Sequence, residues 1–87
     1  MNKNQIIAEI IQWIEDDRRA ENLEPITLTA KTLLLEQLVF DSLKILQFVN
    51  WLEQNYAVVI GIENMTASFF ASPESIATQL IKQKMLN

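Results

Sequence analysis

Residues 41–56 read DSLKILQFVNWLEQNY, and this stretch decides the fold. Apolar residues recur in it at spacings of three and four, which is typical of an amphipathic helix, so we predict a helix from Ser42 to about Tyr56. The predicted core arc of this helix consists of Ile45, Phe48, Val49, Leu52 and Tyr56, with Leu46 at its edge. Polar side chains take most of the opposite side.

Leu43 and Trp51 are the apolar residues of this helix that fall within its polar arc. Trp51 has a structural explanation, because an indole ring can lie over neighbouring aliphatic side chains or pack under a loop. Leu43 has a weaker one, since it follows Ser42 directly at the exposed end of the helix. We therefore regard Leu43 as a candidate contact for a partner.

Upstream, a first amphipathic helix is predicted over residues 4–19. Its apolar face is formed by Ile6, Ile7, Ile10, Ile11, Trp13 and Ile14. Residues 20–40 then form a long connection, in which Pro25 blocks helix continuation. We expect its leucines to pin this connection across the helices, and they are Leu33, Leu34, Leu35 and Leu38. A short strand over residues 26–28 is the alternative, although it lacks a convincing partner.

Downstream, residues 57–62 are predicted to be a buried extended connector, because no second strand is available for pairing. Asn64 or Thr66 could cap a short helix that ends at about Phe70. Ser72 and Pro73 then give a strong start signal for a last helix, which runs to about residue 84. The predicted fold is a single all-α domain over residues 1–87: a small four-helix bundle, three long helices plus one short helix, with a long loop between the first and second helices.

Composition excludes several classes of function. The 87 residues have a net charge of -4 and include no cysteine and no histidine. Disulfides, thiolate metal sites and the commonest general base are therefore missing, which removes most small-enzyme mechanisms. The negative charge repels phosphate backbones and disfavours nucleic acid as a partner. Without a long apolar run or a signal peptide, we expect a cytoplasmic protein without membrane contact.

The helix pattern, the long first loop and Asp41-Ser42-Leu43 at the start of the second helix together resemble the acyl carrier and peptidyl carrier protein family. The resemblance covers nearly the whole chain, from residue 6 to residue 80, and residues 33–52 read like a family signature. Two further segments, IENMT at 62–66 and FASPESI at 70–76, resemble the region around the family's third and fourth helices.

This resemblance implies that Ser42 is the attachment point of 4'-phosphopantetheine, which a phosphopantetheinyl transferase donates from coenzyme A with Mg²⁺. A phosphodiester there would face free N–H groups and the positive end of the helix dipole. Asp41 matches the family's acidic neighbour, whose implied use is to orient the transferase complex or its metal. Taken alone, Ser42 could be a plain N-cap; Ser72 lacks the Asp-Ser-Leu context and is interpreted as only a cap.

The chain departs from the family pattern in two respects. Many carriers have a glycine shortly before the serine, whereas residues 37–42 read QLVFDS, so this loop must turn differently. Fatty-acid carriers usually present an acidic second helix to basic enzymes, but Glu53 is the only acid here after Asp41. Because electrostatic steering by this helix should be weak, we expect recognition through a different surface. It consists of Leu43, Leu46, Gln47 and Asn50.

We therefore expect a discrete, monomeric carrier protein without catalytic activity of its own. Its arm on Ser42 would carry acyl, aminoacyl or polyketide intermediates as thioesters between loading and downstream biosynthetic enzymes of a specialised pathway. The absence of flanking linkers favours a stand-alone protein over a fragment of a larger synthase. Phe48, Trp13 and Tyr56 would crowd an internal cavity, which favours a short or polar cargo.

Two other functions are alternatives to a carrier protein. One is an unmodified helical protein–protein interaction module, in which Leu43 and Trp51 anchor a partner. The other is a small hydrolase with Ser42 as its nucleophile. The hydrolase lacks a histidine base, and Lys44, the lysine nearest in sequence, points about 200° away around the helix.

Overall fold

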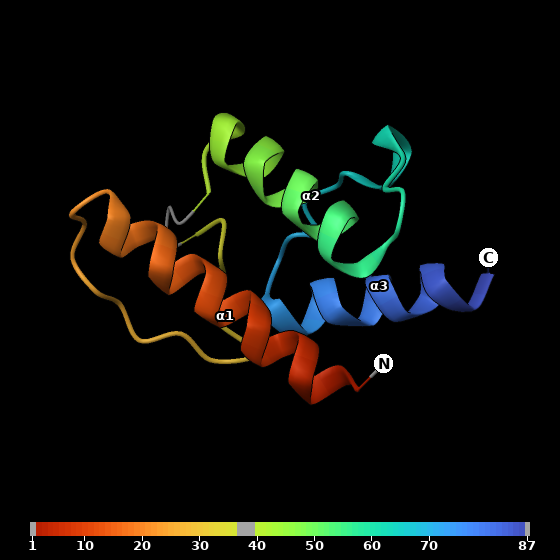
Figure 1. Ribbon diagram of the computed structural model, residues 1–87, viewed down its shortest axis with the longest axis horizontal. Helices are drawn as coiled ribbons and strands as arrows, with labels where there is room; N and C mark the ends of the chain where they lie inside the picture. The colour runs from red at the N-terminus through yellow and green to blue at the C-terminus, as the bar shows by residue number, and fades with distance from the viewer. Residues whose placement is uncertain (1, 37–39, 87) are drawn as a thin grey trace.

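The computed structural model describes residues 2–36 and 40–86, and it is helical (Figure 1). Its elements are α1 (Lys3–Ala20), α2 (Ser42–Tyr56), the 3₁₀ turn η1 (Ile62–Asn64) and α3 (Pro73–Leu86). No strand occurs in the described residues, so the alternative of a strand over residues 26–28 is wrong. The all-α class and the three long helices are confirmed, with bounds close to those expected from the hydrophobic pattern.

The predicted short fourth helix is replaced by a single 3₁₀ turn. After η1, Thr66 starts only one further turn, in which its hydroxyl accepts a hydrogen bond from the Phe69 N–H at 3.2 Å. The chain bends at Ala71, and Pro73 disfavours a helical backbone at Ser72, so this turn does not continue into a helix. The fold is therefore three helices and a turn, and a four-helix bundle is not confirmed.

Each helix begins at a side-chain cap. The Asn2 side chain accepts hydrogen bonds from two backbone N–H groups at the start of α1. The Ser72 hydroxyl accepts one from the Ser75 N–H at 3.1 Å, and Pro73 takes the first position of α3. Ser72 is thus a cap, as the sequence predicts. The end of α2 is marked by Ala57, which adopts a left-handed conformation with φ 54° and ψ 47°.

The core is built from the apolar faces of the helices. On α1 the buried residues are Ile6, Ile7, Ile10 and Ile14. Ile11 and Trp13 are half-buried against them. On α2 the buried residues are Phe48, Val49 and Leu52, with Ile45 and Tyr56 half-buried. Leu46, expected at the edge of this arc, lies outside it with 61% of its surface exposed.

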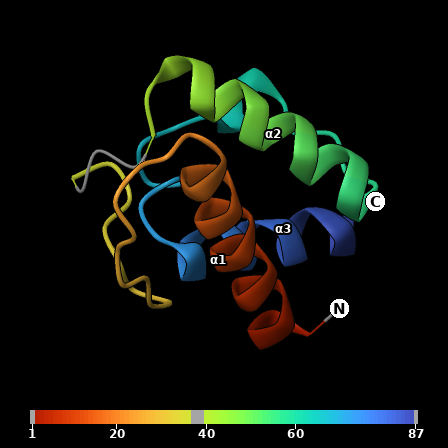
Figure 2. The same cartoon turned by 60° about the vertical axis from the view of Figure 1, so that its left-hand side comes forward.

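Aromatic side chains hold α2 on the rest of the molecule. Cα atoms of α1 and α3 come within 8 Å of each other, whereas within the described residues α2 keeps its Cα atoms farther than that from both. Phe48 fills this gap, with its ring centroid 5.0 Å from that of Phe40 and 5.1 Å from that of Trp13. α1 and α2 run antiparallel, as Figures 1 and 2 show. Bulky rings, rather than close backbone approach, therefore position α2.

The long first loop is pinned to the start of α3. Leu34 is fully buried, and its N–H donates to the Ala71 carbonyl at 3.0 Å. The prediction that the leucines pin the loop is right for Leu34 and, in part, for the half-buried Leu35. It is wrong for Leu33, which is 48% exposed, while Leu38 lies outside the described residues.

The connector after α2 is only half buried. Val58 and Ile60 lie in the core, but Val59 is 82% exposed, because successive side chains of an extended chain point to opposite sides. The Ile60 N–H donates to a carboxylate oxygen of Glu53 at 2.8 Å, which fixes the connector against α2. A uniformly buried connector was therefore the wrong prediction.

Candidate functional site

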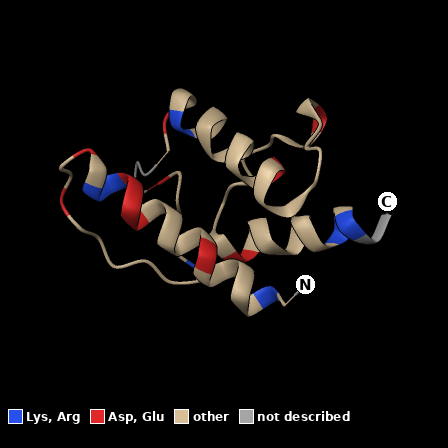
Figure 3. Cartoon of the chain, viewed as in Figure 1, with Lys and Arg blue, Asp and Glu red and all other residues tan. Residues whose placement is uncertain are grey.

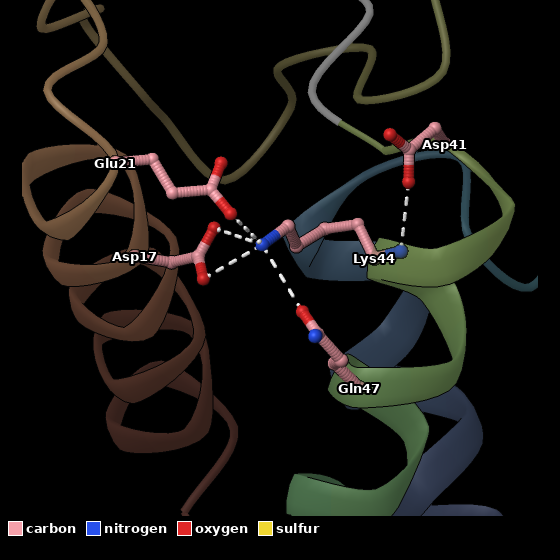
Figure 4. A network of polar contacts seen from close by, with 5 residues as sticks. All are labelled: Asp17, Glu21, Asp41, Lys44 and Gln47. Atoms are coloured by element: carbon pink, nitrogen blue, oxygen red, sulfur yellow. Dashed lines mark hydrogen bonds and ion pairs between the residues drawn. The ribbon is translucent and has the colours of Figure 1, made fainter.

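Asp41, not Ser42, caps α2. The backbone of Asp41 is extended, and its Oδ1 accepts a hydrogen bond from the Lys44 backbone N–H at 2.8 Å, as Figure 4 shows. Its carbonyl oxygen also accepts the Ile45 N–H at 2.9 Å. Aspartate and serine are similarly good caps, and the backbone angles give the role to the first of the two. The interpretation of Ser42 as a plain N-cap is therefore wrong.

Ser42 is the first residue of α2 and is exposed to solvent. Its hydroxyl has no hydrogen-bond partner among residues 2–36 and 40–86. The first turn of a helix leaves N–H groups without partners inside the helix. Here Asp41 accepts a hydrogen bond from the Lys44 N–H. The N–H groups of Ser42 and Leu43 have no partner within the described part of the chain. An exposed hydroxyl thus lies beside free backbone donors at the positive end of a helix.

Phe40 anchors the backbone immediately before this site. Its side chain is 7% exposed, and its ring packs edge-on against Phe70 with a centroid distance of 6.5 Å. Among the described residues only Asn22 and Ala57 combine a side chain with positive φ, so Phe40 needs no glycine-like backbone. The positions where many carriers have glycine, 38 and 39, lie outside the described residues.

The Lys44 side chain extends toward α1 and joins α2 to it, as Figure 4 shows. Its Nζ lies 2.7 Å from Oδ2 of Asp17 and 2.9 Å from Oε1 of Glu21, and it also donates to Oε1 of Gln47 at 3.1 Å. The hydrogen bond to Asp17 raises the pKa of the Lys44 ammonium above its ordinary value, against an opposing effect of burial. Because its side chain is only 12% exposed, this cation is tied to α1 and is not presented to solvent.

Sequence reasoning missed the α1 partners of Lys44. Asp17 and Glu21 lie 27 and 23 positions before it in the chain. No local spacing rule connects residues this far apart, so the pairing depends on how α1 and α2 pack. The only signal in the sequence is the position of both acids near the end of α1.

The four residues expected to contact partners form one exposed stripe on α2. They are Leu43, Leu46, Gln47 and Asn50, all classed as exposed. Their spacing of three, four and seven positions places them on one side of the helix. Leu43 is 65% and Leu46 61% exposed, so both leucines present apolar surface to solvent. We call these four residues the α2 stripe.

Acidic groups near the α2 stripe come from α1 rather than from α2. Glu53, the only acid of α2 after Asp41, is half-buried and accepts the Ile60 N–H. Figure 3 shows acidic residues along α1 and at its C-terminal end, and basic residues near the end of α3. Weak steering by α2 itself remains our prediction, but α1 contributes charge beside it.

The described residues offer limited support for other kinds of site. They contain no group of three or more His, Cys, Asp or Glu placed to hold a metal ion. No helix among them is both long and apolar enough to cross a membrane. Comparisons with protein-family models and with curated protein sequences give no match.

Proposed function

We propose that this chain is a carrier protein, with 4'-phosphopantetheine attached to Ser42. The observation that carries the proposal is at the start of α2. There Asp41 supplies the cap, and the neighbouring Ser42 hydroxyl is exposed and has no hydrogen-bond partner among the described residues. A serine that merely stabilised the helix would hold the cap itself, as Ser72 does on α3.

The groups around Ser42 fit a phosphodiester. The N–H groups of Ser42 and Leu43, which have no partner within residues 2–36 and 40–86, together with the helix dipole would stabilise its negative charge. In the attachment step, Oγ of Ser42 bonds to phosphorus, its proton is lost, and adenosine 3',5'-bisphosphate leaves coenzyme A. Asp41 uses Oδ1 for the cap and is otherwise exposed, so its second oxygen is available to a transferase and its Mg²⁺.

In this proposal other proteins supply the catalysis. The thiol of the arm would hold acyl, aminoacyl or polyketide cargo as a thioester. The α2 stripe next to Ser42 would contact the transferase, the loading enzymes and the downstream biosynthetic enzymes. Phe48 is fully buried among Phe40, Trp13 and Trp51, and this packing leaves little room for a long chain, which supports a short or polar cargo.

Intact mass spectrometry tests the proposal. The protein is incubated with coenzyme A, Mg²⁺ and a broad-specificity phosphopantetheinyl transferase. We expect a gain of one phosphopantetheine group in the wild type and in Ser72→Ala, and none in Ser42→Ala. No gain in the wild type, or an equal gain in Ser42→Ala, contradicts the proposal.

A second variant separates the two roles assigned to Asp41. Asn is a good N-cap, so Asp41→Asn keeps the helix start while removing the charge. If the charge orients the transferase or its metal, modification of Asp41→Asn slows although its unfolding free energy stays near that of the wild type. Unchanged modification would limit Asp41 to capping.

The exposure of Leu43 and Leu46 favours one alternative, an unmodified protein-interaction module. This alternative predicts no mass gain and a partner whose binding is weakened by Leu43→Ser. The hydrolase has no support from the site, because Nζ of Lys44 is engaged with Asp17 and Glu21 and is not directed to the serine as a base.

A further inference from the structure

A shallow, open groove lies between α1 and α2, and Ser42 is not among the residues that line it. It has a volume of about 270 Å³. The residues that line it are Glu9, Gln12, Trp13, Asp16, Trp51 and Asn55. Trp51 and Asn55 come from α2, the helix that also carries the α2 stripe.

Stacked indole rings form one part of the groove. The chain has two tryptophans, and both line it. The ring centroids of Trp13 and Trp51 lie 5.8 Å apart with an angle of 27° between the planes, and both side chains are half-buried. They contact Phe48 in the core while keeping part of their surface at the groove. Partly exposed indoles attract cations through the negative face of the ring.

Carboxylates form the other part. Glu9 and Asp16 lie two helical turns apart on α1, about 10.5 Å along its axis. The Tyr56 hydroxyl donates a hydrogen bond to Glu9. Oδ1 of Asp16 accepts hydrogen bonds from Gln12 at 2.8 Å and from Arg19 at 3.0 Å. A carboxylate accepts about four hydrogen bonds, so both groups keep capacity for another donor.

Asp16 already binds a guanidinium group in this chain. Its pair with Arg19 is exposed, since the two side chains retain 57% and 73% of their surface. Exposed pairs of this kind are weak, so a competing guanidinium group with additional contacts can displace Arg19. The aromatic and acidic lining together excludes an anion and is poorly suited to a purely apolar side chain.

We propose that this groove receives an arginine side chain from a partner protein. The planar guanidinium group can stack on an indole face and donate hydrogen bonds to a carboxylate at the same time, which a lysine ammonium does less well. The net charge of -4 favours basic partners in general, and the groove gives that preference a defined place. The proposal needs neither the Ser42 hydroxyl nor its modification.

The test titrates the ¹⁵N-labelled protein with N-acetyl-arginine amide and follows the two indole N–H signals by NMR. N-acetyl-citrulline amide is the matched control, because it has nearly the same shape but no charge. We expect saturable shifts of both indole signals with the arginine probe and at least about fivefold weaker binding of the citrulline probe. Equal binding of the two probes overturns the proposal.

Charge variants locate the binding. Asp16→Asn and Glu9→Gln should each weaken the arginine probe about two- to fivefold. Glu63→Gln removes the same charge from η1, outside the groove, and should leave the affinity unchanged. Equal weakening by Asp16→Asn and Glu63→Gln would show a general charge effect and overturn the proposal. Binding should persist in Ser42→Ala, so failure of the carrier function and failure of the groove are distinguishable.

Discussion

Replacing Ala57 by glycine should stabilise the protein. Ala57 ends α2 in the left-handed region, at φ 54° and ψ 47°, and its N–H donates to the Glu53 carbonyl. A side chain in this conformation costs about 1–2 kcal/mol because Cβ approaches the following carbonyl oxygen. Glycine removes that cost but gains about 0.4–1 kcal/mol of freedom in the unfolded chain. Since Ala57 is exposed, its methyl group adds little burial, and the net expectation is a gain of about 0.5–1 kcal/mol.

The same substitution at Ala8 provides the control. Ala8 is exposed on α1 and has helical backbone angles, so Ala8→Gly should lower the unfolding free energy by about 1 kcal/mol. Urea unfolding followed by tryptophan fluorescence measures both variants. A gain of about 0.5–1 kcal/mol corresponds to a rise in Tm of about 2–8 °C for a domain of this size. If Ala57→Gly destabilises the protein as much as Ala8→Gly does, the left-handed cap and the strain argument are wrong.

Further predictions concern charges and caps. Tyr56, the only tyrosine, has a pKa raised above its ordinary 10.0, first by burial and then by its hydrogen bond to Glu9. Its phenolate absorbance should therefore appear at a higher pH in the folded than in the unfolded protein, and this difference in pH should be smaller in Glu9→Gln. The contribution of Tyr56 to stability should fall as pH rises above 10.0. Lys44→Met should lower the unfolding free energy by about 1–2 kcal/mol, because it leaves the charge of Asp17 unpaired. Adding Asp17→Asn removes that charge and should recover part of the loss, whereas additive effects of the two substitutions would contradict the ion pair. Ser72→Ala should cost about 1 kcal/mol in urea unfolding, whereas Ser42→Ala should lie within about 0.5 kcal/mol of the wild type, and equal losses would refute the assignment of the caps.

Local chemistry in the sequence was enough to predict the long helices. Their apolar spacing and their cap residues act over a few positions, so the bounds of α1, α2 and α3 follow from neighbours in the chain. The short helix predicted from Asn64 or Thr66 does not form; the chain instead bends at Ala71 and enters α3 at Pro73, which a cap signal at Thr66 does not reveal. The alternating burial of Val58 and Val59 likewise depends on which side of the connector meets the core.

The candidate site was predictable only in part. The positions of Ser42 and of the exposed α2 stripe follow from the periodicity of one helix. The choice of Asp41 over Ser42 as the cap depends on backbone angles that two adjacent good capping residues cannot reveal. The pairing of Lys44 with Asp17 and the groove lined by the two tryptophans cannot be predicted without knowing how α1 and α2 pack.

The cap at Asp41 changes how Ser42 is weighed. If Ser42 held the cap, stability would explain why a serine stands there, and its exposure would say little about function. With the cap on Asp41 and the preceding residue Phe40 anchored in the core, the helix starts with a hydroxyl that makes no hydrogen bond to any residue the structure describes. Alanine has a higher helix propensity than serine, so stability alone favours alanine at position 42. A serine there is better explained by chemistry on its oxygen, which the mass measurement detects directly.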